Sequence, residues 1–264
     1  MGSDLSYIEV HIEGYIGTIV FDRPKSRNAF NSRMIAEISS ALDAMQEKGV
    51  RVVVFRAVKG SSIWSAGYDI KELANTKDQF TSDQNDPLEF LLQKITHFPA
   101  PVIAMVHGSV WGGACEFALS CDLVFGDPTC SFAVTPANLG VPYSARGILR
   151  FLNRLPLNIV KEMFFTARPI DAARAERISL LNFLVPEEEL ETFTYEMARE
   201  ISNKSPLTLS STKEQARILC NAVPLRPEVW EYMRKLCRSV YGSADYQEGV
   251  KAFQEKRKAV FQGK

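Results

Sequence analysis

The first residues of the chain alternate between apolar and polar side chains. Within residues 7–12, Ile8, Val10 and Ile12 fall on one side, which is the period of a half-buried strand. A turn over residues 14–17 separates this segment from a second apolar run at residues 18–21. The pattern therefore predicts a β-hairpin at the N-terminus.

Strand and helix patterns then alternate through the first half of the chain. Residues 32–47 carry apolar side chains at steps of three and four, which predicts an amphipathic helix that ends before Gly49. Further along, the sequence predicts strands at residues 51–56, 61–66, 101–107, 122–125 and 131–134 and helices near residues 71–73 and 88–95. This alternation is typical of an α/β fold with mainly parallel strands.

The segment from Met105 to Asp122 predicts a strand, a tight turn and a helix made largely of small residues. Gly112 and Gly113 open this helix, and the first N–H groups of a helix have no partner within it. Because glycine lacks a side chain, a ligand can approach these N–H groups closely. One interpretation is a site for a negative oxygen; the other is that small residues let helix and sheet pack closely.

A second corner of the same kind lies at Ala66 and Gly67. Ligands of α/β proteins gather at the carboxyl ends of strands, so the two corners are expected near one another. If their N–H groups face each other, they can hold one carbonyl oxygen and stabilise the enolate of a thioester. Loss of one such donor costs about 3 kcal/mol of transition-state stabilisation.

The second half of the chain is mostly helical in pattern. A loop with two prolines and a glycine is predicted over residues 135–143, a helix start with acidic residues at 185–190, and a basic amphipathic helix at 247–262. Residues 75–86 are polar without a clear period and are interpreted as a mobile loop.

Composition narrows the class of function. The chain has 264 residues, with 31 basic and 31 acidic side chains, which gives no indication of a nucleic-acid partner. No apolar run is long enough to span a bilayer. Five unevenly spaced cysteines indicate a reducing, cytoplasmic setting, and with only three histidines no metal site is expected. The basic loop at residues 22–30 is either a solvated turn or a grip for phosphates.

Three motifs in order resemble the crotonase (enoyl-CoA hydratase/isomerase) superfamily. They are Arg-Pro-Lys-Ser-Arg-Asn-Ala at residues 23–29, Ser-Ala-Gly-Tyr-Asp-Ile-Lys-Glu-Leu at 65–73 and His-Gly-Ser-Val-Trp-Gly-Gly-Ala-Cys-Glu at 107–116. The resemblance covers essentially the whole chain. It implies a spiral of ββα units over residues 1–200, and a C-terminal helical region over 201–264 for trimerisation and CoA contact. It also implies a homotrimer or a dimer of trimers.

The same resemblance implies an acyl-CoA substrate and no separate cofactor, since CoA is part of the substrate. The N–H groups of Ala66 and Gly113 would hold the thioester oxygen. Residues that match CoA-contacting segments are Arg23, Lys25, Arg27, Ser65, Asp69 and Ile70. Phe253 and Lys256 match tail positions that reach the CoA of a neighbouring subunit.

Carboxylates decide the reaction within this family. Hydratases use two glutamates; Glu116 matches the first, but Pro136 stands where the second would fall, and proline cannot transfer a proton. Simple hydration is therefore disfavoured. Glu116 itself is interpreted either as a catalytic acid/base or as an ordinary acid in the first turn of a helix.

Further segments resemble family members that decarboxylate methylmalonyl-CoA. They are residues 109–113, 135–143, 245–249 and 253–258. In those members a tyrosine at the position of Tyr143 faces the substrate carboxylate. Decarboxylation of a malonyl thioester needs an electron sink and finally a proton, and a phenol can orient the carboxylate while it or a water supplies that proton.

One departure concerns Tyr68, where those decarboxylases have a histidine. A phenol has a single O–H and cannot act as a cation, so Tyr68 is interpreted as a hydrogen-bond donor near the thioester or as a wall of the acyl pocket. The favoured function is decarboxylation of methylmalonyl-CoA or malonyl-CoA to propionyl-CoA or acetyl-CoA and CO2. The alternatives are enoyl-CoA hydration or isomerisation with Glu116, and non-catalytic binding of acyl-CoA.

Overall fold

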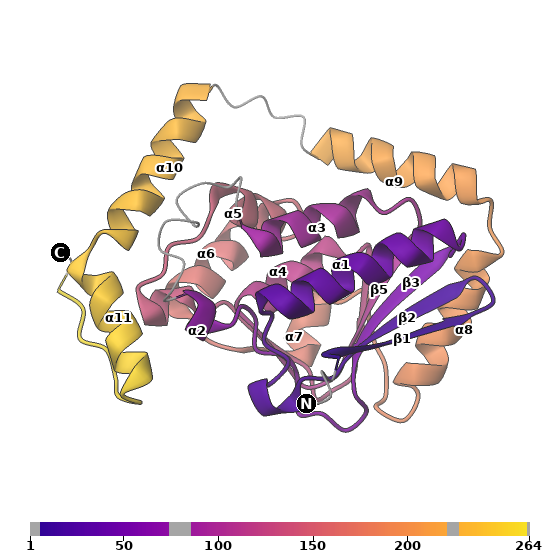
Figure 1. Cartoon of the computed structure of the whole chain (residues 1–264), viewed down its shortest axis with the longest axis horizontal. Coiled ribbons are helices and arrows are strands. Elements are labelled where there is room, and N and C mark those ends of the chain that lie inside the picture. Colours follow the sequence, from indigo (N-terminus) through magenta and orange to yellow (C-terminus); the bar gives the residue numbers. More distant parts are fainter. Residues whose placement is uncertain (1–5, 74–85, 221–226, 263–264) are drawn as a thin grey trace, which may run out of the picture.

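The computed structural model describes residues 6–73, 86–220 and 227–262 and contains two β-sheets; Figure 1 shows strands of the larger sheet beside α1. Most of the predicted loop at residues 75–86 lies outside the described residues. The larger sheet has six strands in the order β1-β2-β3-β5-β7-β10. Its strands are β1 (Ile8–Glu13), β2 (Ile16–Phe21), β3 (Val52–Ala57), β5 (Val102–Val106), β7 (Leu123–Gly126) and β10 (Phe183–Leu184). All neighbouring pairs are parallel except the antiparallel hairpin β1–β2.

The smaller sheet has four strands in the order β4-β6-β8-β9. They are β4 (Ile63–Ser65), β6 (Ser109–Trp111), β8 (Ser131–Ala133) and β9 (Ile170–Asp171). β4, β6 and β8 pair in parallel, and β9 runs antiparallel to β8. Since β3, β5 and β7 of the large sheet are each followed by a strand of the small one, the chain winds as a spiral whose successive turns stack side by side.

Helices cover both faces of the large sheet. The main core lies between this sheet and α1 (Ser32–Glu47), α3 (Pro87–His97) and α4 (Gly113–Ser120), while a second core lies under α8 (Leu190–Ser202). In the main core Phe117 of α4 stacks on Phe30 at 5.0 Å and meets Phe55 edge-on at 4.9 Å. These fully buried rings fix α4, and with it the position of its first N–H groups.

The remaining helices follow the two sheets. They are α2 (Ile70–Leu73), α5 (Ala145–Leu152), α6 (Leu157–Thr166), α7 (Ala172–Arg177), α9 (Pro206–Cys220), α10 (Pro227–Tyr241) and α11 (Ala244–Gln254), with short 3-10 turns η1 (Pro24–Ser26) and η2 (Pro136–Leu139). α10 and α11 lie at the end of the molecule opposite α8 (Figure 1). α11 packs on η2 so closely that a β-carbon on Gly249 would stand 2.0 Å from the carbonyl oxygen of Leu139.

The α/β class, the parallel pairing and the helix at 32–47 are confirmed. Three details of the sequence prediction are wrong. Val10 and Ile12 are exposed, because β1 is the edge strand and only its Ile8 is buried. Residues 109–111 form the strand β6 and are not part of a turn. A strand of three residues is too short to show the alternation of apolar and polar side chains that would predict it. The tail helix runs from 244 to 254, since Ser243 caps it and Lys256 has a positive φ. The division of the chain at residue 200 stays a prediction.

Candidate active site

The two predicted corners lie side by side because the strands that lead into them are paired. β4 runs parallel to β6, with Ser65 opposite Val110, so both strands end at the same edge of the small sheet. Residues 66–68 follow β4, and Gly112 with Gly113 follows β6. The small sheet thus brings two segments that are over forty residues apart in sequence into contact.

Gly113 is the first residue of α4 and supplies one N–H group to the site. The helix cap, Gly112, has φ +53°, a conformation that favours glycine. The Gly112 amide donates to the carbonyl of Ala133 at 2.8 Å. Among the described residues, the Gly113 amide has no acceptor, as is usual for the first turn of a helix. This N–H group is therefore placed to bind an oxygen from a ligand.

The Ala66 amide does not have the predicted role. It donates to the carbonyl of Arg27 at 2.9 Å, a bond that ties the basic loop to the corner and commits the donor within the protein. The expected donor is thus wrong by two positions, because the sequence gives no indication of which peptide of the corner faces inward.

The amide that faces Gly113 is that of Tyr68. Tyr68 forms an isolated parallel β-bridge with Phe30. The two hydrogen bonds of this bridge involve the neighbours of Tyr68: the Phe30 amide donates to the Gly67 carbonyl at 2.7 Å, and the Asp69 amide donates to the Phe30 carbonyl at 2.9 Å. In this pattern the N–H of Tyr68 itself points away from Phe30. A β-carbon built on Gly113 would stand 3.5 Å from the Tyr68 nitrogen. The two amides are therefore neighbours.

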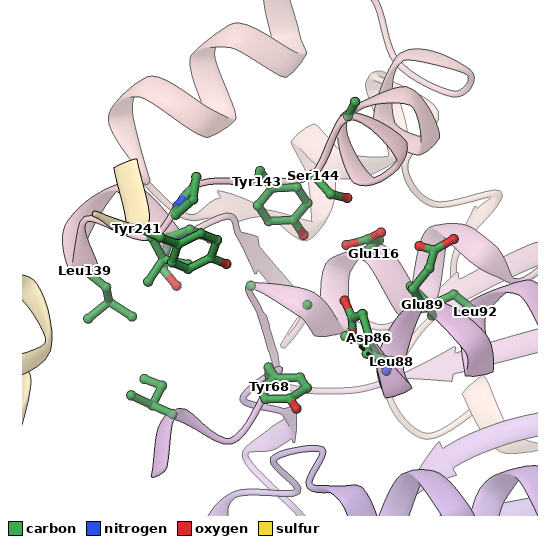
Figure 2. A pocket seen from close by; sticks show the side chains of 18 of the residues that line it. Tyr68, Asp86, Leu88, Glu89, Leu92, Glu116, Leu139, Tyr143, Ser144 and Tyr241 are labelled. Carbon is green, nitrogen blue, oxygen red and sulfur yellow. Dashed lines mark hydrogen bonds between the residues drawn. The ribbon is translucent and has the colours of Figure 1, made fainter. Parts of the chain in front are cut away.

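A cavity of about 160 Å³ opens at these two corners (Figure 2). Its wall is formed by residues from both corners, α3, α4, the 135–145 segment and α10. The lining includes Tyr68, Asp86, Glu89, Gly113, Glu116, Pro136 and Tyr143. Figure 2 shows Tyr143 and Glu116 on one side of this cavity and Tyr68 on the other. Apart from its carboxylates, the lining is largely apolar, which suits a short acyl group.

Glu116 lies on α4 and is only 7% exposed. Its carboxylate accepts a hydrogen bond from Arg150 Nη1 at 2.6 Å, and Arg150 also donates to both oxygens of Glu89 at 2.7 and 2.8 Å. One guanidinium from α5 thus bridges two buried carboxylates, which come from α3 and α4. Such charge-assisted contacts fix the direction of all three side chains.

Burial and the contacts with Arg150 together set the pKa values of Glu116 and Glu89. Burial raises the pKa of Glu116, and the Arg150 charge opposes that rise without cancelling it. Burial also acts on Glu89, but the hydrogen bonds and charge of Arg150 outweigh it, so the Glu89 pKa lies below its usual value. The same contacts raise the pKa of Arg150, so it stays cationic at any pH of interest.

Tyr143 is held between the acidic group and an aromatic cluster. Its ring meets Phe164 edge-on at 4.9 Å and Phe151 at 6.1 Å. Its hydroxyl faces Glu116 (Figure 2). Burial and the nearby Glu116 carboxylate raise the phenol pKa well above its usual value, so the O–H stays protonated and able to donate.

Asp86 and Tyr68 also line the cavity. Asp86 caps α3 by accepting from the Leu88 amide at 2.9 Å, and burial raises its pKa to about 6. Burial and then the charges of Asp86, Glu72 and Asp69 raise the pKa of the Tyr68 phenol. The Tyr68 side chain is therefore a neutral hydroxyl in the wall of the pocket, consistent with either of its two predicted roles.

Three of the predicted CoA contacts have their polar groups engaged within the protein. Arg23 donates to Asp69 at 2.8 Å and to the Ala29 carbonyl at 2.8 Å, with both charged side chains at most 15% exposed. Ser65 is fully buried; its hydroxyl donates to the Asn28 carbonyl and accepts from the Gly67 amide. The side chains of these three residues build the corner, and contact of Arg23, Ser65 or Asp69 with CoA stays a prediction.

The other predicted contacts are placed differently. Ile70 lines the cavity. Lys25 and Arg27 are exposed in the basic loop, which is attached to the corner through the Ala66 bond. Phe253 and Lys256 are exposed in and just after α11 and are not among the residues that line this cavity. Their contact with a neighbouring subunit stays a prediction.

Sequence reasoning missed Arg150, Glu89 and Asp86. A signal for Arg150 exists: Arg146 and Arg150 are four residues apart and fall on one face of α5, two turns after Tyr143. Asp86 was within the predicted mobile loop, and Glu89 resembled an ordinary acid in a first helical turn. Only the packing of α3, α4 and α5 shows that these charges meet.

In residues 6–73, 86–220 and 227–262, no group of three or more histidine, cysteine or acidic side chains is arranged to hold a metal ion. Across the same residues, every helix is too short or too polar to cross a membrane.

A known protein family and individual proteins match this chain along nearly its whole length. The profile of the family described as "Enoyl-CoA hydratase/isomerase" matches residues 11–264. The methylmalonyl-CoA decarboxylase of Escherichia coli (strain K12) is 42% identical over 258 residues, which cover 97% of this chain and 98% of that protein. A probable mitochondrial enoyl-CoA hydratase of Dictyostelium discoideum is 31% identical, over 96% of this chain and 89% of that protein.

Solved structures agree with these matches. A methylmalonyl-CoA decarboxylase in complex with 2-nitronate-propionyl-CoA has a TM-score of 0.94 and 41% identity, over 98% of this chain and 99% of that chain. A methylmalonyl-CoA decarboxylase complexed with 2S-carboxypropyl CoA has a TM-score of 0.95 and 40% identity, over 99% of this chain and 100% of that chain. The fold of this chain is that of these proteins.

Proposed function

The chain belongs to the enoyl-CoA hydratase/isomerase family, and we propose that it is a carbon–carbon lyase that decarboxylates methylmalonyl-CoA to propionyl-CoA and CO2. Malonyl-CoA, which yields acetyl-CoA, belongs to the same substrate class. The observation that carries the proposal is one pocket that is lined by Gly113, Tyr68 and Tyr143 and in which the Gly113 and Tyr68 amides are neighbours. Full-length similarity to a methylmalonyl-CoA decarboxylase supports the same assignment.

The two amides provide the electron sink. The bond between the α-carbon and the carboxylate breaks, CO2 leaves, and the electron pair forms an enolate with its negative charge on the thioester oxygen. The N–H groups of Gly113 and Tyr68 stabilise this oxygen, and the start of α4 adds the positive end of its dipole. The thioester itself accepts the charge, so the reaction needs no separate cofactor.

Tyr143 orients the carboxylate that leaves and takes part in the final proton transfer. Its phenol is neutral, so it can donate a hydrogen bond to the substrate carboxylate, holding that group out of the thioester plane. After CO2 has left, the enolate takes a proton at the α-carbon from the phenol or from a water, and propionyl-CoA forms.

Hydration of an enoyl thioester is less well supported. Pro136 lines the cavity where the resemblance to hydratases would place a second glutamate. Glu116 is bound to Arg150, so it is not an unconstrained base. Two alternatives are a hydratase or isomerase that uses Glu116 alone and a non-catalytic acyl-CoA-binding protein. Turnover of different acyl-CoA esters distinguishes both from a decarboxylase.

The proposal also covers the oligomeric state of the protein and the residues that contact CoA. The C-terminal helices expose large apolar side chains, among them Leu207 at 82% and Leu219 at 74%, which supports association into a homotrimer or a dimer of trimers. Lys25 and Arg27 are exposed beside the corner and would contact the CoA phosphates, with Phe253 and Lys256 of a neighbouring subunit. A cytoplasmic location stays a prediction from the cysteine pattern.

The direct test is turnover of a panel of acyl-CoA esters by the purified protein, with mass detection. We expect propionyl-CoA and CO2 in equal amounts from methylmalonyl-CoA, and no hydration of crotonyl-CoA. Hydration of crotonyl-CoA that is lost in Glu116→Gln would favour the hydratase alternative. Tight binding with no turnover of any ester would favour the binding protein.

A further inference from the structure

Arg150 is the common partner of the two acidic side chains beside Tyr143. It contacts Glu116 at 2.6 Å and Glu89 at 2.7 Å, and its side chain is only 15% exposed. Arg146, one turn earlier on α5, lies 3.7 Å from Glu89 and is 44% exposed. Of the described residues, only Arg150 makes an ion pair with Glu116.

This arrangement meets a difficulty that the proposed substrate creates. Methylmalonyl-CoA brings a free carboxylate into a pocket whose wall already contains Glu116 and Glu89. Like charges a few ångströms apart in a partly dehydrated site repel strongly, because little solvent screens them. An anionic acyl group can enter only if the charges of these two residues are compensated.

We propose that Arg150 is a positioning residue that determines specificity for carboxylate-bearing acyl groups, by neutralising Glu116 and turning its carboxylate toward α5. This inference rests on the proposed function, since it concerns the free carboxylate of that substrate. It assigns Arg150 no contact with the reacting atoms. The pocket accepts an anion because its own nearest anion already has a bound cation.

Among the described residues, no other cation beside Glu116 can replace Arg150. The titratable or charged groups that face Glu116 or the same cavity come from six parts of the chain. They are Arg150 on α5, Glu89 and Asp86 on α3 and its cap, Cys115 on α4, Tyr143 on the 135–145 segment, Tyr68 on the first corner, and Arg234 and Tyr241 on α10. Arg234 is paired with Glu231 on its own helix. Replacing Arg150 would therefore leave Glu116 beside Glu89 without its cation.

The experiment measures binding of two thioether analogues that cannot turn over. Carboxypropyl-CoA carries the carboxylate and propyl-CoA lacks it, so the ratio of their Kd values isolates the charge. The variants are Arg150→Met, Arg150→Lys and the double variant Glu116→Gln/Arg150→Met. Arg146→Met is the matched control, because it removes an arginine from the same face of α5 without touching Glu116. Calorimetric Kd values are measured between pH 5.5 and 8.5.

For Arg150→Met we expect carboxypropyl-CoA to bind at least about tenfold more weakly at pH 8, with propyl-CoA changed less than about threefold. Below the pKa of the orphaned Glu116 that carboxyl is neutral, so the loss shrinks as the pH falls. The double variant removes the charge of Glu116 and leaves Glu89 with Arg146 at 3.7 Å, so we expect it to restore most of the lost binding. Arg150→Lys keeps the positive charge but cannot bind Glu116 and Glu89 with the same planar group, so we expect an intermediate loss of carboxypropyl-CoA affinity.

Equal weakening of both analogues in Arg150→Met, or no restoration in the double variant, would overturn the proposal and leave Arg150 a structural residue. Loss of selectivity in Arg146→Met as large as in Arg150→Met would overturn it as well. If Arg150→Met does not fold, the ratio in Arg150→Lys and in the double variant still decides. The Kd measurements do not depend on turnover. Failure of the wild-type protein to release CO2 would therefore contradict the proposed function without bearing on the role of Arg150.

Discussion

A β-carbon on Gly67 would stand 2.9 Å from the amide nitrogen of Gly113 and 2.3 Å from the carbonyl oxygen of Trp111. The first corner therefore presses its backbone directly against the start of α4, and only glycine permits this contact. Gly67 also has φ +82°, a conformation that other residues rarely adopt. The distance between the Tyr68 and Gly113 amides thus depends on one residue that provides no chemistry of its own.

Gly67→Ala should impair catalysis far more than folding of the rest of the chain. The collision is with backbone, so the corner must shift, and losing one aligned amide costs about 3 kcal/mol of transition-state stabilisation, or roughly 100-fold in kcat. Turnover of methylmalonyl-CoA measures this effect. Gly60→Ala is the matched control, since Gly60 has φ +80° with nothing within 4 Å of its β-carbon. Equal losses in the two variants would show that backbone strain, not the corner contact, is responsible.

Tyr143→Phe should lower kcat by about 10- to 100-fold, because it removes the only hydroxyl assigned to the carboxylate while keeping the ring between Phe151 and Phe164. Steady-state kinetics on methylmalonyl-CoA test this expectation. Tyr195→Phe serves as the control: its hydroxyl bonds Thr18 at 3.0 Å under α8, so its loss costs about 1 kcal/mol of stability and leaves kcat unchanged. An unchanged kcat in Tyr143→Phe would remove the phenol from the mechanism.

The same phenol sets an expectation for the alkaline limb of the pH profile. Burial and the nearby Glu116 hold the Tyr143 pKa well above its usual value, so the O–H remains protonated through pH 9. We expect kcat between pH 7 and 9 to show no loss from phenol ionisation. A fall in kcat over that range that disappears in Tyr143→Phe would contradict the assigned protonation state.

Asp86→Asn should change the pH dependence of stability. Burial raises the Asp86 pKa to about 6 in the folded protein, above its unfolded value of 3.8. The folded state therefore prefers the protonated form, and stability is lost as the pH rises from 3.8 through 6. The asparagine variant does not ionise, so its stability relative to wild type should improve by up to about 3 kcal/mol between pH 4 and pH 8.

Urea unfolding at both pH values measures this difference for Asp86→Asn. Asp43→Asn is a suitable control, because the Asp43 side chain is 60% exposed and pairs with Lys94 at the surface. If the stability of Asp86→Asn relative to wild type is the same at pH 4 and pH 8, burial does not perturb Asp86 as described.

Lys213→Met should loosen α9 from the core. The Lys213 side chain is 11% exposed, and its ammonium donates to Asp122 at 2.7 Å and to the carbonyls of Ile95 and Ala100. Removing it leaves Asp122 without its cation, at a cost of about 2 to 4 kcal/mol in the free energy of unfolding. Lys204→Met breaks an exposed pair with Glu200 and should cost under about 0.5 kcal/mol. Similar costs in both variants would show that Lys213 does not anchor α9.

The sequence predicts much of the fold because the spacing of apolar side chains and the positions of glycines are properties of short segments. Residues 32–47 show a clear helical period, and the buried strands at 51–56 and 101–107 show continuous apolar runs. The three-residue strand β6 and the edge strand β1 escape this reasoning, since their burial depends on which sheet they join. Pairing of β4 with β6 brings the two corners together, as the glycine motifs suggested.

The site is predicted less completely, for a physical reason. The sequence identifies Gly113, Glu116, Tyr143 and the corner at 66–68, all of which line one cavity. It cannot show that Ala66 donates to Arg27 and that Tyr68 faces Gly113, since this depends on the bridge between Tyr68 and Phe30. Nor can it show that Arg150 joins Glu89 to Glu116, because the three residues lie on three helices that meet only on folding.

The central claim is that the Gly113 and Tyr68 amides share the thioester oxygen, and a crystal structure with a bound acyl-CoA analogue that retains this oxygen tests it most directly. The account predicts that oxygen within about 3 Å of both nitrogens, with the acyl group directed toward Tyr143. A thioester oxygen bound elsewhere, or held by Gly113 with the Tyr68 nitrogen out of hydrogen-bond range, would contradict it.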